Sequence, residues 1–357
     1  MRKFFILAVT VAWIIGFLTD TWAGQEIIVK REAAEKFATL PDGVRFPEGI
    51  TANPSTEAIY VATFDFGPNS NKLLRLGKNG QLAGQRDFAG TPLLGLQFNS
   101  LDNKVYICNF GASKIQPIAA DFTDATVIED VAFIPTIGPP PDRVVGNPDN
   151  SQDTIHFGNS FPAPNGLIFD GSGNLYISDS FQGAIFRINN AHTCSTPCQV
   201  TMVKHDGFLA TAGFPPFGAN GLALSGDGTK LFIANTGDDR VLQLDLGTGN
   251  LTVWAESING ADGIAFHHGR LVVAANQADE VVILNDRGRV IAKLGDFLGI
   301  ESDGSPRGLL FPASLVIVDD TMFVTNLALP LTGAENEPEQ DVTQYTISRI
   351  KIPKQLP

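Results

Sequence analysis

The sequence is poor in cysteine, in basic residues and in low-complexity segments. Its 357 residues include three cysteines, and 25 Lys and Arg are outnumbered by 38 Asp and Glu, which gives a formal net charge of −13. Because a general nucleic-acid binder needs a basic face for the phosphates, this balance argues against one. The lack of charge runs and of Gln/Asn or Ser/Gly tracts argues against a disordered or fibrous chain. A compact, acidic, globular protein remains.

Several common catalytic signatures are also missing. The chain has no Gly-x-Ser-x-Gly elbow, no phosphate-binding glycine loop and no His-x-x-x-His helix. These gaps argue against a serine hydrolase, a nucleotide-dependent enzyme and a zincin-type metalloprotease.

The first 23 residues have the pattern of a secretory signal peptide. Arg2 and Lys3 form a positive start, residues 4–18 are almost wholly apolar, and residues 21–23 carry a cleavage pattern that makes Gly24 the mature start. A permanent membrane anchor is the alternative, but the apolar run over residues 4–18 is shorter than the about 20 residues that a spanning helix needs. We therefore expect an exported protein, secreted or periplasmic, with no membrane attachment after cleavage of residues 1–23.

The cysteines fit an exported chain. Cys194 and Cys198 lie in a turn-rich segment, where a local disulfide is expected. A zinc knuckle is the alternative, but the second ligand pair of such a site is missing. Cys108 lies within an apolar run and is expected to be a small core residue.

An internal repeat is the strongest pattern in the sequence. Six times, a short motif is followed by an apolar, β-rich run, and further apolar runs separated by turns usually come next. Four antiparallel strands repeated in this way are typical of propeller blades. We predict an all-β, six-bladed β-propeller with four-stranded antiparallel blades, forming a single domain over residues 24–357. The motifs are Pro47-Glu48-Gly49, Leu93-Leu94-Gly95, Pro164-Asn165-Gly166, Ala219-Asn220-Gly221, Ala261-Asp262-Gly263 and Pro312-Ala313-Ser314.

The segments outside the repeat have predicted places too. Residues 26–30 have no blade of their own and are expected to supply the outer strand of the last blade, which would remove an open edge. Residues 32–37 are expected to form at most one short helical turn. The inserts at 131–163 and 204–218 are candidate lids, with plain surface loops as the alternative.

One residue of each motif is expected to lie on the propeller axis. The first strand of a blade lines the central channel, so the residues before the motif Gly or Ser should form a ring. Turn preferences explain Asn and Asp before Gly, but they do not explain Glu48. Carboxylate and amide oxygens together favour a hard divalent cation, calcium above all, with Zn²⁺, Mn²⁺ or Mg²⁺ as alternatives. The predicted metal ligands are Glu48, Asn165, Asn220 and Asp262.

The four motifs that carry these ligands resemble those of the gluconolactonase/regucalcin (senescence marker protein) family, to which diisopropyl fluorophosphatase and the paraoxonases are related. The resemblance covers about residues 40–350. It implies a metal-dependent hydrolase of a lactone or related ester, in which Glu48, Asn220 and Asp262 hold the ion and Asp262 is also the general base. Asn165 would be a fourth ligand or a substrate contact. Sugar-lactone relatives carry Arg where this chain has Ala163, so the substrate is expected to differ.

Other polar residues are candidates for the same face. The second strands end in Asn109, Asp179, Asn235 and Asn326, and Asp179 is predicted to lie near the ion or the substrate. Strand-end turn chemistry is the alternative. Arg143, with Phe157 and Phe161, is a candidate substrate contact in the first insert.

Two other functions stay open from the sequence. One is a non-catalytic, NHL-like ligand-binding propeller, and the other is a strictosidine-synthase-like or lyase activity on the same scaffold. The Phe- and Pro-rich inserts favour an apolar ligand over a sugar acid. A small molecule is the expected partner, and the oligomeric state is left open.

Overall fold

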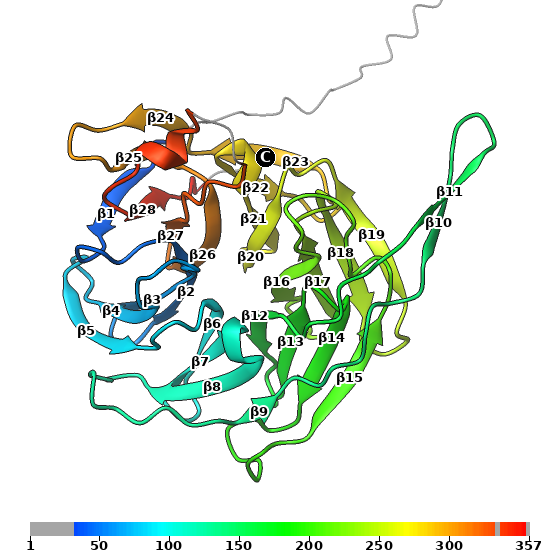
Figure 1. Ribbon diagram of the computed structural model, residues 1–357, viewed down its shortest axis with the longest axis horizontal. Coiled ribbons are helices and arrows are strands. Elements are labelled where there is room, and N and C mark those ends of the chain that lie inside the picture. Colours follow the sequence, from blue (N-terminus) through cyan, green and yellow to red (C-terminus); the bar gives the residue numbers. More distant parts are fainter. Residues whose placement is uncertain (1–31, 333–335, 355–357) are drawn as a thin grey trace, which may run out of the picture.

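The computed structural model describes residues 32–332 and 336–354. Within them, six four-stranded antiparallel sheets stand in a ring (Figure 1), which confirms the predicted six-bladed β-propeller. The predicted signal peptide and residues 26–30 lie outside the described residues. No helix of the described part is long and apolar enough to cross a membrane.

The blades follow one another along the chain. From the axis outward, blade 1 consists of β2 (Pro47–Asn53), β3 (Ala58–Thr63), β4 (Lys72–Leu76) and β5 (Leu82–Asp87). In the same order, blade 2 has β6 (Leu93–Asn99), β7 (Lys104–Asn109), β8 (Lys114–Ala119) and β9 (Ala132–Phe133). Blade 3 has β12 (Pro164–Phe169), β13 (Leu175–Asp179), β14 (Ala184–Ile188) and β15 (Val200–His205).

The second half of the ring repeats the pattern. Blade 4 has β16 (Ala219–Leu224), β17 (Lys230–Asn235), β18 (Arg240–Asp245) and β19 (Leu251–Glu256). Blade 5 has β20 (Ala261–His267), β21 (Arg270–Ala275), β22 (Glu280–Leu284) and β23 (Val290–Leu294). Blade 6 has β26 (Pro312–Val318), β27 (Thr321–Asn326), β28 (Thr346–Lys351) and β1 (Glu35–Thr39).

Short elements lie between the blades. Two hairpins are formed by β10 (Arg143–Gly146) with β11 (Gln152–Ile155) and by β24 (Phe297–Ile300) with β25 (Pro306–Gly308). The β10–β11 hairpin projects away from the disc (Figure 1). Three single-turn 3₁₀ helices are described: η1 (Phe110–Ala112), η2 (Asn276–Ala278) and η3 (Pro338–Asp341).

Closure of the ring uses an early strand, as predicted, but the strand lies further along the chain. β1 pairs antiparallel with β28, with Glu35 opposite Arg349 and Thr39 opposite Thr346. The expected helical turn over 32–37 is therefore wrong, because residues 35–37 belong to β1. Tertiary pairing with the last blade decides the conformation there, where local propensity is weak.

The core lies between neighbouring blades. The second strands are buried on both faces, because each blade packs against two others, and so they form continuous apolar runs. In β7, for example, Tyr106, Ile107 and Cys108 are all buried, with Cys108 fully so, as expected for a core residue. The first insert begins later than predicted, because Ala132 and Phe133 complete blade 2 as β9.

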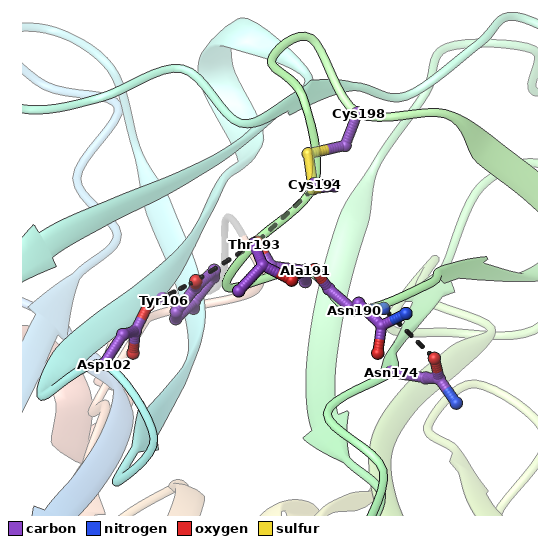
Figure 2. Close-up of a disulfide and its surroundings, with 8 residues drawn as sticks. All are labelled: Asp102, Tyr106, Asn174, Asn190, Ala191, Thr193, Cys194 and Cys198. Carbon is purple, nitrogen blue, oxygen red and sulfur yellow. Dashed lines mark hydrogen bonds between the residues drawn. A yellow bond between two sulfur atoms is a disulfide. The ribbon is translucent and has the colours of Figure 1, made fainter.

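The predicted disulfide is present in the β14–β15 connection. Cys194 and Cys198 are bonded, with their Cα atoms 5.6 Å apart (Figure 2). The amide of Cys198 donates a hydrogen bond to the carbonyl of Val131 at 2.8 Å. The bridged loop of blade 3 is thereby attached to the outer edge of blade 2.

Candidate functional site

A β-bulge aims one residue of each blade at the axis. The first strands β2, β6, β12, β16, β20 and β26 surround the centre of the disc (Figure 1). In all six, the pairing with the second strand shifts in register across the motif, for example between Pro47 and Ile50. A bulge redirects the side chains that it contains. The residues so placed, called the ring residues below, are Glu48, Leu94, Asn165, Asn220, Asp262 and Ala313.

The motif glycines allow the blades to approach closely at the axis. A Cβ on Gly49 would lie 2.1 Å from the carbonyl oxygen of Leu94, and one on Gly95 would lie 2.1 Å from that of Asn165. The same holds for Gly166 against Asn220, at 2.3 Å. Each of these glycines therefore accommodates the ring residue of the next blade. The motif glycine is needed for packing between blades and not only for a turn.

The four predicted metal ligands line one small cavity at the axis. Glu48, Asn165, Asn220 and Asp262 are between 2% and 5% exposed, and all four contribute to its lining. The structure thus brings together side chains from blades 1, 3, 4 and 5. These four residues are far apart in the sequence, between positions 48 and 262, and only the closed ring brings them together.

The two amides are oriented by hydroxyl groups of their own blades. Asn165 Nδ2 donates to Ser180 Oγ at 2.9 Å, and Ser180 Oγ in turn donates to the Ala219 carbonyl at 2.7 Å. Because that hydroxyl proton is already used, the hydroxyl accepts from the amide nitrogen, and the Asn165 oxygen is left for the axis. Asn220 repeats this arrangement on the Thr236 hydroxyl at 2.9 Å.

The two carboxylates keep an unpaired oxygen each. Asp262 Oδ2 accepts from Asn276 Nδ2 at 2.9 Å, whereas Asp262 Oδ1 and Glu48 Oε2 are buried without a hydrogen-bond partner. Burial raises the pKa of both groups, and for Glu48 the nearby Asp262 carboxylate raises it further. Uncompensated carboxylates are costly to bury. A divalent cation would neutralise both, so this donor set fits a hard metal ion.

Sequence reasoning missed the residues that hold the ring in place. Ser180, Thr236 and Asn276 directly follow the second strands of blades 3, 4 and 5. The expected residues lie one position earlier and bond elsewhere: Asn109, Asp179 and Asn326 within their own blades, and Asn235 to carbonyls of the connection before blade 4. In a strand, a shift of one residue exchanges the two faces. The residue after the strand-end position in blades 3, 4 and 5 is the one that bonds the ring residue, and the repeat could have identified it.

Asp179 sits behind the ring instead of within the cavity lining. Its carboxylate accepts from the amides of Ala163 at 3.1 Å, Phe181 at 3.1 Å and Gln182 at 2.9 Å. It is fully buried, and burial raises its pKa. These contacts fix the chain just before Asn165, while a contact of Asp179 with substrate stays a prediction.

Arg143 anchors the first insert to blade 4. Its guanidinium lies 2.9 Å from Asp238, and its side chain and that of Asp238 are 12% and 8% exposed. The guanidinium also lies over the rings of Phe157 and Phe208, at 5.9 and 4.9 Å from their centroids. Arg143 thus has a structural role in the described residues, and its contact with substrate stays a prediction.

The cavity has an apolar side opposite the polar one. The apolar lining comes from blades 6, 1 and 2 and from the connections above the ring. It consists of Phe64, Leu94, Pro215, Phe217, Phe311, Leu327, Leu329 and Leu331. This set is called the apolar wall below.

Comparison with known proteins identifies solved structures of the same fold. A luciferin-regenerating enzyme is 15% identical, with a TM-score of 0.62, over 91% of this chain and 96% of that one. The calcium-binding protein regucalcin from Agrobacterium tumefaciens is 16% identical, with a TM-score of 0.61 and the same coverage. A candidate gluconolactonase is 16% identical, with a TM-score of 0.54, over 90% and 92% of the two chains.

Sequence comparison alone finds no relative: no protein-family model and no curated protein matches this chain. The structural similarity at this level of identity defines the fold. The chain is a six-bladed β-propeller of the kind seen in regucalcin and gluconolactonase-like proteins.

Proposed function

We propose that this protein is a divalent-metal-dependent hydrolase of a lactone or related ester, with Ca²⁺ as the preferred ion. The observation that carries the proposal is the pair of buried, unpartnered carboxylate oxygens, Glu48 Oε2 and Asp262 Oδ1, in one cavity with two oriented asparagines. The name regucalcin and its description as calcium-binding, in a protein of the same fold, support the choice of ion.

The cation would be held by oxygens of Glu48, Asn165, Asn220 and Asp262. When bound, such an ion supplies a Lewis acid that polarises the substrate carbonyl. The protein's contribution is a fixed set of ligands, because Ser180, Thr236 and Asn276 hold three of the four side chains from behind. Asn165 serves as a ligand or as a substrate contact.

Asp262 is suited to proton transfer. Asn276 holds the carboxylate through Oδ2, and Oδ1 has no partner within the protein, so that beside the ion it has a second lone pair to take a proton from an attacking water. The water oxygen bonds to the carbonyl carbon, and the bond from that carbon to the ester oxygen breaks. Asp262 then returns the proton to the departing alkoxide. An ester yields an acid and an alcohol, and a lactone yields one hydroxy acid.

The test compares Asp262→Asn with Glu256→Gln, a control that removes an exposed carboxylate on β19. Each protein, from Gly24 onward, is stripped of metal with a chelator and titrated with Ca²⁺. Thermal unfolding and hydrolysis of aryl esters and small lactones are then measured. We expect Ca²⁺ to stabilise the wild type and Glu256→Gln, and Asp262→Asn to lose about 10²- to 10⁴-fold in turnover.

The other outcomes separate the competing functions. Stabilisation by metal without turnover would favour a binding propeller or a lyase. Binding of none of Ca²⁺, Zn²⁺, Mn²⁺ and Mg²⁺ would overturn the metal site, and with it the hydrolase.

A further inference from the structure

We propose that the substrate is an uncharged, apolar ester or lactone whose alkyl or aryl body lies on the apolar wall, and not a polyhydroxylated sugar lactone. This inference rests on the proposed function for the reaction itself. The choice of substrate class rests on the cavity lining alone.

The polar groups of the cavity offer few hydrogen bonds to a sugar once an ion is bound. Among the described residues that line it, the only ionisable ones are Glu48 and Asp262. The amide nitrogens of Asn165, Asn220 and Asn276 each donate one hydrogen bond within the protein, and the side-chain oxygens of the polar ring residues are the proposed ligands of the ion. The Thr236 hydroxyl donates to the Ala261 carbonyl at 2.8 Å. Most hydroxyls of a polyhydroxylated sugar would therefore lose water here without an equal number of protein partners, which is unfavourable.

The space above the ring is too small for the body of a substrate. The cavity has a volume of about 30 Å³, whereas a single water requires about 10–15 Å³. An ion with one or two small groups fills it. The same ring residues Glu48, Asn165 and Asn220 also border the central channel between the first strands, which has about 350 Å³. On the face that carries the apolar wall, the remainder of a substrate extends outward over the surface that surrounds the small cavity.

That surface is a continuous set of phenylalanines. Phe64, in the cavity wall, contacts Phe217 and Phe66 with ring centroids 6.0 and 4.7 Å apart. Phe64 also contacts Phe110 at 5.4 Å, and Phe110 contacts Phe161 at 5.8 Å. At the outer end, Phe66 and Phe161 are 65% and 44% exposed. An apolar path thus leads from the ring to solvent and matches an extended alkyl or aryl group.

The first experiment measures kcat/KM of the Ca²⁺-loaded protein for 4-nitrophenyl acetate, butyrate and hexanoate, for alkyl-substituted δ-lactones and for glucono-δ-lactone. We expect an increase of up to about fourfold for each added methylene until the apolar path is filled, and little hydrolysis of glucono-δ-lactone. A flat series, or preference for glucono-δ-lactone, would overturn the proposal.

Variants locate the effect. Phe217→Asn should flatten the chain-length series, and Phe217→Leu should retain most of it, because Leu keeps the wall apolar. Leu331→Gln gives a second test on a partly exposed loop residue, so that a failure of one variant to fold is not decisive. The control is Val144→Thr on β10, which is 59% exposed and lies outside the cavity lining.

A binding measurement separates this proposal from the hydrolase itself. Heptyl phenyl ketone has no bond to hydrolyse, and its binding to the wild type and to Phe217→Asn is measured by calorimetry. Binding that Phe217→Asn weakens at least fivefold, in a protein that hydrolyses nothing, would support the apolar ligand class and refute the hydrolase. Hydrolysis without ketone binding, and without chain-length dependence, would support the hydrolase and refute the apolar ligand class.

A second and independent observation lies at the other end of the blades. His267 ends β20 and His268 follows it, and Asp320 lies in the turn between β26 and β27. Asp262 and His267 are the second and last residues of β20, a separation of about 16 Å at the usual rise per residue. This cluster is therefore separate from the ring.

We infer that these three side chains form a transition-metal site. Asp320 Oδ1 lies 3.4 Å from His267 Nε2 and 3.6 Å from His268 Nε2. Ligands of a tetrahedral ion with bonds of about 2.0–2.2 Å stand about 3.3–3.6 Å apart. The three ligand atoms also lie within 4.8 Å of one another. Two imidazoles and a carboxylate favour Zn²⁺ or Cu²⁺ over Ca²⁺.

The test uses an untagged Glu48→Gln/Asp262→Asn protein, which removes the ring carboxylates. Zn²⁺ and Cu²⁺ binding is measured by calorimetry, and Cu²⁺ ligation by electron paramagnetic resonance. We expect one site that His268→Gln or Asp320→Asn weakens at least tenfold. His156→Gln, which breaks an exposed His–Asp pair 2.8 Å apart, should change nothing. Equal binding by the His268, Asp320 and His156 variants would overturn this site.

Discussion

The two halves of the ring differ at one structural position. The residue that follows the second strand is Ser180, Thr236 or Asn276 in blades 3 to 5, and each bonds a ring residue. In blades 6, 1 and 2 the corresponding residues are apolar: Leu327, Phe64 and Phe110. The same backbone position thus orients polar ring residues on one side, and on the other it supplies apolar side chains, two of which, Phe64 and Leu327, belong to the apolar wall. The backbone positions are equivalent in all six blades, and the difference between the two halves lies in the side chains.

Glu48 belongs to the apolar half but carries a carboxylate. Its neighbour at the position after the second strand is Phe64, and its Oε2 has no partner. Asp262, in the polar half, has Asn276. The proposed cation would therefore be more important for Glu48 than for Asp262. The predictions below test this difference between the halves.

Glu48→Leu should have the largest effect on Ca²⁺ affinity. It gives blade 1 the ring residue of blade 2, Leu94, and removes one of the two carboxylates. Loss of one of two charged ligands should lower Ca²⁺ affinity at least about 100-fold. The metal-free protein should unfold at a higher temperature, because a buried carboxyl group with an unpaired oxygen is removed. Calorimetric Ca²⁺ titration and thermal unfolding measure both effects. Lower metal-free stability would contradict the account of Glu48.

Asn276→Leu gives blade 5 the residue of blade 6. Asp262 then loses the bond to its Oδ2, and we expect a loss of about 10- to 100-fold in metal affinity or turnover. Leu327→Asn is the reciprocal variant. It should leave Ca²⁺ affinity nearly unchanged, because blade 6 has Ala313 at the ring position and no ligand to orient. Equal losses in the two variants would refute a division between the halves.

Gly166→Ala tests the packing that both halves share. The new Cβ would lie 2.3 Å from the Asn220 carbonyl oxygen, and we expect a loss of about 1–3 kcal/mol in the free energy of unfolding. Gly226→Ala is the matched control, because no atom lies within 4 Å of its Cβ. Urea unfolding of the metal-free proteins distinguishes the two.

The response to Ca²⁺ should depend on pH in a defined direction. Burial raises the pKa of Glu48 and Asp262 above 4.5 and 3.8, so the metal-free folded protein keeps protons that the unfolded chain has released. The stability of the metal-free protein therefore falls as the pH rises from the ordinary pKa values of these carboxyl groups to their raised values in the folded state. Ca²⁺ must displace those protons. The increase in melting temperature caused by Ca²⁺ should thus be larger at pH 8 than at pH 5, and Glu48→Leu should reduce this difference.

The repeat made the fold predictable, because each unit has its own turn and strands and a motif that ends in Gly or, in the sixth unit, in Ser314. The ring residues were predictable for the same reason, since one position recurs in every unit. The supporting residues were missed because they lie one residue from the expected positions, and only the register of β13, β17 and β21 shows which side chain faces the cavity. The closing strand was displaced from 26–30 to 35–39, because its place depends on pairing with β28, distant in sequence.

The pairing of β1 with β28 has a consequence for the order of events during synthesis. The strand that closes blade 6 is made before the rest of its own blade, and it must wait for residues 346–351. Glu48 likewise emerges long before Asp262. A growing chain can complete several blades before the ring residues meet, and the proposed ion site lacks its second carboxylate until the fifth blade exists. On the proposed function, metal capture would mark the end of folding and would not guide its beginning.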